Sequence, residues 1–202
     1  MPKRRGSWRA CSRSSRRTAR ASAPSVSTHR RIDEAAAALL HVTEPATEGD
    51  EVAVLDSLLA QVIRGPTFLP VRSALDAALS SGQIELIQSQ EIQSSLAAWS
   101  QKAAEALEEE RDGRNFVSSD LLPELYEATN LDVVHRTFVE STERGETGVL
   151  EWGDSVSRLR VSGTLDNLLW RRRFYAATAV TALDDLREHL VDTAELISRT
   201  QP

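Results

Sequence analysis

The sequence has few of the residues that break helices or cross-link chains. It contains nine glycines, seven prolines and 5% aromatic residues in 202 positions. Its one cysteine, Cys11, excludes an intramolecular disulfide and a cysteine-based zinc site. No stretch approaches the roughly 18–20 apolar residues that a membrane-spanning helix needs. The longest apolar run near the N-terminus, residues 35–40, is also too short for a secretion signal.

The abundant residues favour helix. Ala, Leu and Glu are frequent, and all three have high helix propensity. Hydrophobic residues make up 41% and charged residues 27%, which is typical of a soluble globular protein. We therefore predict an all-α fold, an antiparallel helical bundle with a long C-terminal helix.

Acidic residues are missing from one end of the chain. Residues 1–31 hold ten Lys and Arg and no acid, so residues 32–202 hold 14 basic and 30 acidic residues, a net charge of −16. The N-terminal segment also lacks an apolar period. We therefore expect residues 1–30 to be a disordered Arg/Ser-rich arm and residues 31–202 to be the helical domain.

Three explanations of the arm compete. Its composition is that of an organelle transit peptide. It would also suit an arm that binds an anionic polymer such as nucleic acid by releasing counterions. A GC-rich gene read in the wrong frame, or from a wrong start, gives a similar composition, and we favour this third explanation.

Apolar spacing and breaker residues predict where the helices lie. Helices are expected at about 31–44, 50–64, 70–81, 90–111 and 165–198. Glu44-Pro45 and Gly65-Pro66 should end the first two. The fourth helix is expected to break at Asp112-Gly113, with Ser118-Ser119-Asp120 capping a continuation. Residues 129–163 are expected to form loops and short helices.

Residues 74–99 predict two helices joined by a tight corner. Gly82 should end the first helix in a left-handed conformation. Ile84, Leu86 and Ile87 should then turn into the core, and Ser89 should cap the next helix.

Two seams of small and apolar residues predict the core. The fourth helix carries Ile92, Leu96, Trp99, Ala103 and Ala106. The last helix carries Leu169, Ala176, Leu183, Leu190 and Ile197 at seven-residue spacing. Arg172 and Thr193 interrupt its alternate row, which holds Ala179 and Leu186. We therefore favour packing within one chain over a leucine zipper.

No motif for catalysis, a cofactor or a metal is found. Asp132-x-x-His135, His41-x-x-Glu44 and His189-x-x-Asp192 are single matches in an acidic chain, and a di-metal bundle needs two Glu-x-x-His pairs. The run 108–110 is interpreted as a solvated helix end. The sequence gives little support for a DNA-reading role of the corner, because a helix that enters a DNA groove must neutralise phosphates and its second helix offers one cation, Lys102.

The segment LLWRRRFY, residues 168–175, is the most distinctive charged motif. One hypothesis is an interaction site at Trp170, Arg171 and Arg173. In the other, which we favour, Trp170 and Phe174 lie one turn apart and pack, while the arginines either extend their charged ends to solvent along the helix or pair with the abundant acids. Three consecutive helical residues cover most of the helix circumference, so the arginines cannot form one patch.

Two segments carry a resemblance to a known family. ALDAALSSGQIELIQSQEIQSSLAAW (74–99) and TLDNLLWRRRFYAATAVTALDDLREHLVDTAELI (164–197) are similar to a family of uncharacterised bacterial proteins with one N-terminal transmembrane helix and an all-helical domain. The resemblance spans roughly residues 31–200 and carries no catalytic residue. It implies a body beside the bacterial inner membrane. The Arg/Ser arm stands in place of the family's spanning helix, which is why we expect a misread or truncated start.

Three functions follow as expectations. The first is a non-enzymatic helical interaction or scaffold module, anchored to the membrane in its natural form and soluble as written, which contacts a protein partner or a second copy through its helix faces. The second is a soluble helical protein whose arm binds an anionic polymer, although nucleic acid is not the favoured partner. The third is an enzyme, which would need a polar cluster near His135 and Glu140.

Overall fold

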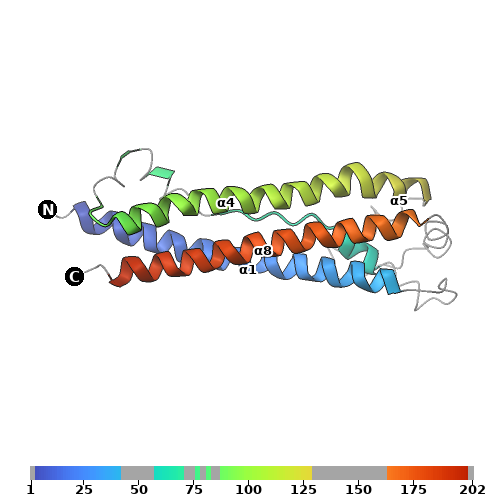
Figure 1. The fold of residues 1–202 in the computed structure, drawn as a ribbon, viewed down its shortest axis with the longest axis horizontal. Helices are drawn as coiled ribbons and strands as arrows, with labels where there is room; N and C mark the ends of the chain where they lie inside the picture. The colour runs from blue at the N-terminus through green and yellow to red at the C-terminus, as the bar shows by residue number, and fades with distance from the viewer. Residues whose placement is uncertain are drawn as a thin grey trace, which may run out of the picture. The chain divides into compact units, whose positions relative to one another are not determined.

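A computed structural model describes residues 3–41, 57–70, 76–77, 81–82, 87–128 and 163–199. These residues contain helices and no strand, which confirms the all-α class. The helical elements are α1 (Lys3–His41), α4 (Gln90–Phe116), the π-helical turn η2 (Val117–Leu121), α5 (Leu122–Ala128) and α8 (Thr164–Arg199) (Figure 1). The expected long C-terminal helix is α8. Most of the helix expected at 70–81, the corner residues Ile84 and Leu86, and the region 129–162 with His135 and Glu140 lie outside the described residues.

The chain divides into two compact units. The first unit is Met1–Ser27, Thr67–Glu110 and Ala179–Pro202, and the second is Thr28–Pro66 and Arg111–Thr178. Helices α1, α4 and α8 each supply residues to both units.

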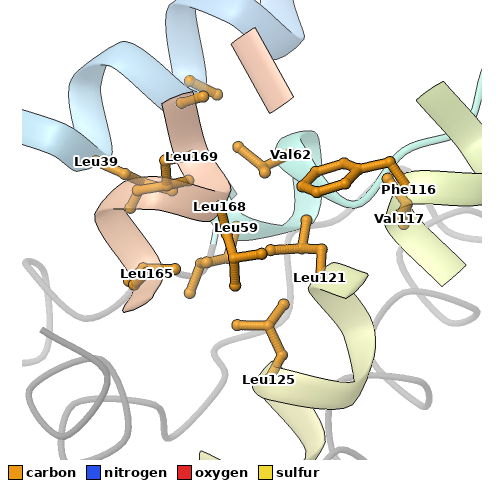
Figure 2. Close-up of a cluster of buried hydrophobic side chains, with 12 residues drawn as sticks. Leu39, Leu59, Val62, Phe116, Val117, Leu121, Leu125, Leu165, Leu168 and Leu169 are labelled. Carbon is orange, nitrogen blue, oxygen red and sulfur yellow. The ribbon is translucent and has the colours of Figure 1, made fainter. Parts of the chain in front are cut away.

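The second unit has a leucine-rich core. Figure 2 shows these side chains meeting from α1, the helical segment 57–62, the end of α4, η2, α5 and α8. Within this unit the Phe116 ring contacts the Tyr175 ring, and Asp120 forms an ion pair with Arg171. Asp120 follows Phe116 in the sequence, whereas Arg171 precedes Tyr175. The two segments therefore run antiparallel.

The first unit is built on the two predicted seams. All five residues of the α4 seam are at most 1% exposed, as are the α8 residues Leu183, Leu190 and Ile197. The remaining two members of that α8 row, Leu169 and Ala176, are fully buried in the second unit. The seams predicted from sequence spacing are confirmed.

The signals at the corner are also confirmed where it is described. Gly82 has a φ of 67°, and the Ser81 backbone N–H donates to the Ala77 carbonyl at 3.1 Å. The hydroxyl oxygen of Ser89 accepts the Ile92 N–H at 3.4 Å, and α4 begins at the next residue, Gln90. Glycine is suited to position 82 because it adopts a positive φ without a clash from a Cβ atom.

The expected break at Asp112-Gly113 is wrong. Helix α4 continues through Gly113 to Phe116 and passes directly into η2, where the Leu122 N–H donates to the Val117 carbonyl. Residues 118–120 lie inside this π-helical turn and do not cap a new helix. A glycine inside a helix lowers its stability but does not end it when tertiary contacts favour the glycine.

Helix α1 differs from the expected arm. Its backbone is helical from Lys3, so it includes the segment that we expected to be disordered in isolation. One row of its buried positions alternates steps of four and three, namely Thr18, Ser22, Ser25, His29, Ile32, Ala36 and Leu39, and the adjacent residues Val26 and Ala35 are buried as well. The period of a packed helix is therefore present, but small polar residues fill its first half. A search for apolar residues alone overlooks it.

The charges in the first unit are complementary. Residues 3–27 of α1 contain eight basic and no acidic residues, whereas the described stretches of α4 and α8 in that unit are acidic. Segments of opposite charge attract each other.

Candidate interaction surface

The three consecutive arginines of α8 take different directions, as helix geometry requires. Successive residues are about 100° apart around an α-helix. Arg172 is 1% exposed, whereas Arg171 and Arg173 reach carboxylates on other elements of the second unit. The motif therefore separates into one interior cation and two surface cations.

Arg172 donates to backbone carbonyls from two elements of the second unit. Its Nε is 2.8 Å from the Val62 carbonyl oxygen, and its Nη2 is 2.5 Å from that of Arg64. Its Nη1 is 3.4 Å from the Gly113 carbonyl oxygen in α4. One side chain thus ties the end of the helical segment 57–62 to both α4 and α8.

The acceptors explain how a positive charge is tolerated in the interior. Val62 and Arg64 lie at the C-terminal end of the segment 57–62, where unpaired carbonyls carry the negative end of the helix dipole. Burial lowers the pKa of Arg172 to about 10, which leaves it protonated at neutral pH. Among the described residues, backbone dipoles and not a carboxylate hold this cation.

Gly113 provides the space that the guanidinium occupies. A Cβ at this position would lie 3.2 Å from Arg172 Nη1 and 3.6 Å from Tyr175 Cβ. The first distance is shorter than a normal contact, and three hydrogen bonds restrain the guanidinium. The glycine interpreted from sequence as a helix break therefore permits close contact between α4 and α8.

Arg171 and Arg173 brace the outer side of α8. Arg171 Nη1 is 2.9 Å from Asp120 Oδ1, and its guanidinium lies 4.7 Å from the centre of the Phe116 ring. The hydrogen bond to Asp120, followed by that to Tyr175, raises the pKa of Arg171. Both side chains of the Arg171–Asp120 pair are substantially exposed, so it contributes little stability.

The second brace joins α8 to α1. Arg173 Nε is 2.7 Å from Asp33 Oδ1, and its guanidinium lies 4.9 Å from the centre of the Trp170 ring. This stacking holds the Trp170 side chain close to α8 by a cation–π contact.

Trp170 and Phe174 are left largely open to solvent. Trp170 is 59% exposed and Phe174 is 64% exposed, one turn apart on α8. Phe174 contacts Tyr175 edge-on at 5.7 Å between ring centres, and Tyr175 in turn contacts Phe116 at 5.2 Å. We name Trp170, Arg171, Arg173 and Phe174 the α8 aromatic patch.

The structure places the residues of the sequence hypothesis as follows. Trp170 lies on the outer side of α8, and Arg171 and Arg173 flank it on opposite sides. Each of the two arginines pairs with an acid, which is one of the two outcomes named by the favoured alternative. The two aromatic side chains are exposed, which that alternative did not expect. The sequence interpretation did not predict that Arg172 is buried. The seven-residue spacing of 172, 179, 186 and 193 was the signal that could have indicated it.

Glu110 corrects the interpretation of residues 108–110 as a solvated helix end. It is 1% exposed, and its Oε2 accepts the Phe68 backbone N–H at 2.5 Å. It continues the α4 seam four residues after Ala106. Glu110 of α4 and Arg172 of α8 therefore each form a hydrogen bond to the backbone of the segment 64–70.

A second polar contact joins α4 and α8 in the first unit. The Ser95 and Thr193 hydroxyls are 2.6 Å apart, and Thr193 donates to the His189 carbonyl at 2.7 Å. His189 Nε2 lies 2.8 Å from the Ser95 carbonyl, so this nitrogen is the donor.

In the part of the chain that the structure describes, no three His, Cys, Asp or Glu side chains are grouped to hold a metal.

Comparison with protein-family models, with curated proteins and with solved structures gives no match. Among the described helices, none combines the length and apolar character needed to cross a membrane.

Proposed function

We propose that this chain is a non-enzymatic helical interaction module that contacts a protein through the α8 aromatic patch. The observation that carries the proposal is the exposure of Trp170 and Phe174, at 59% and 64%, on a helix that is otherwise packed through its opposite side. Tryptophan and arginine are the residues most enriched at the energetic centres of protein interfaces.

The construction of the patch supports this role. Ion pairs from Arg171 and Arg173 and the ring contacts of Phe116 and Tyr175 restrict the side chains before binding. Restricting side chains in advance lowers the entropy cost of association. Behind the patch, Arg172 fixes α8 against two neighbouring elements, so the surface is carried by a rigid helix.

Site-directed photo-crosslinking in living cells tests the proposal. A photoreactive phenylalanine analogue replaces Trp170 or Phe174, and the matched control carries it at the exposed α4 residue Glu105. We expect discrete crosslinked protein bands from the two patch positions and none from the control. Identical products from all three positions, or no product from the patch, would contradict the proposal.

We further propose that the helices act as an antiparallel bundle tethered to a bacterial inner membrane. The support is the family resemblance of residues 31–200, which implies an anchor next to the helical domain. Fractionation of the native host tests it with an antibody against the helical body. A membrane-bound species larger than 22.3 kDa supports the tether. A species of this mass in the soluble fraction contradicts it.

A further inference from the structure

We infer that the partner of the α8 aromatic patch is a second copy of this chain, bound through an acidic triad on α8 formed by Glu188, Val191 and Asp192. This inference rests on the proposed function and names the occupant of the same surface. Its basis is that the described part of the chain contains two surfaces with opposite charge and the same layout.

The basic surface has unused donors. Arg173 uses Nε to bind Asp33, and its two terminal nitrogens have no hydrogen bond within the described residues. They lie above the exposed Trp170 ring, with Phe174 one residue further along. Trp170, Arg173 and Phe174 therefore form an i, i+3, i+4 triad that presents two rings and a guanidinium over one turn.

The acidic triad offers matching chemistry. Glu188, Val191 and Asp192 have the same i, i+3, i+4 spacing, and all three are exposed. Val191, at 46% exposure, is one of four large hydrophobic residues that are exposed in the described part of the chain. Neither carboxylate forms an ion pair within the described residues. A valine between two carboxylates can cover an aromatic ring while the carboxylates bind guanidinium nitrogens.

The charges along α8 are complementary in a way that suits this occupant. The first unit's part of α8, Ala179–Arg199, contains five acidic residues and two arginines. The turn of α8 that carries the patch contributes only cations. Attraction between these two stretches on separate copies steers their encounter and weakens as salt screens it.

Sedimentation equilibrium of the full chain at low and high salt tests the inference. The weight-average mass is expected to rise above 22.3 kDa with protein concentration, and to rise less at high salt. Replacing Trp170 and Phe174 with Ser, or Glu188 and Asp192 with Arg, should weaken association by about tenfold or more.

The matched control reverses two carboxylates that are also one turn apart, Glu105→Arg with Glu109→Arg on α4, and should leave the mass unchanged. A charge exchange provides the sharpest test: Arg173→Glu and Glu188→Arg should each weaken association, and the two together should restore it. Far-UV circular dichroism checks that each variant is folded.

The two proposals fail differently. A chain that stays monomeric at all concentrations, or that associates equally with and without Trp170 and Phe174, overturns the second-copy inference. If Trp170 then still crosslinks to another protein in cells, the interaction module stands with a different partner. If it crosslinks to nothing, both proposals fail.

Discussion

Arg172 gives the sharpest test of how the second unit is held together. Arg172→Met keeps a long, flexible side chain but removes the charge and all three donors to the carbonyls of Val62, Arg64 and Gly113. Hydrogen bonds from a charged donor contribute about 1.5–3 kcal/mol each. Burial of the cation, which lowers its pKa to about 10, costs about 3 kcal/mol. The difference between these two contributions leads us to expect that the free energy of unfolding falls by about 2–6 kcal/mol.

A double-mutant cycle with Gly113 tests the geometry behind this number. At an interior helix position, alanine is more favourable than glycine by about 1 kcal/mol. In the parent chain the new Cβ would lie 3.2 Å from Arg172 Nη1, so Gly113→Ala should be destabilising. With Met at position 172 the same change should be neutral or stabilising. Urea unfolding followed by circular dichroism at 222 nm measures all four variants.

Two results would refute this reasoning. If Arg172→Met is neutral or stabilising, the three carbonyls find other partners and the buried charge is a net cost, as observed for some buried ion pairs. If Gly113→Ala has the same effect with Arg and with Met at position 172, the two residues are not coupled. Arg172→Lys is the control that keeps the charge. It should be about as damaging as Met, because one ammonium cannot match the fork of a guanidinium.

Other predictions concern single contacts in the first unit. Glu110→Leu should cost about 1–3 kcal/mol in thermal unfolding because the Phe68 N–H loses its acceptor, whereas Glu110→Gln keeps an oxygen there and should cost less. Thr193→Val should cost about 1 kcal/mol alone and little more when Ser95→Ala removes its hydroxyl partner, and additive losses in chemical denaturation would contradict the contact. Gly82→Ala should cost about 1–2 kcal/mol through backbone strain, since no atom lies within 4 Å of the added Cβ, and an unchanged melting temperature would argue against its positive φ.

The sequence by itself determined the local elements of this fold. The seams of α4 and α8 could be predicted because apolar and small residues recur at helical spacing, and spacing is a property of the chain alone. The stop at Gly82 and the cap at Ser89 could be predicted for a similar reason, because each acts on backbone groups within four residues.

Tertiary structure decided which polar residues are buried and which aromatic residues are exposed. Arg172 is tolerated inside because the end of a helix 110 residues away supplies carbonyls, and Gly113 on another helix leaves it space. The small polar stripe of α1 is buried because other parts of the chain cover it, and apolar spacing does not reveal such a stripe. Trp170 and Phe174 remain exposed because the inward side of α8 is already filled. Each of these outcomes depends on partners distant in sequence, and local pattern carries no information about their positions.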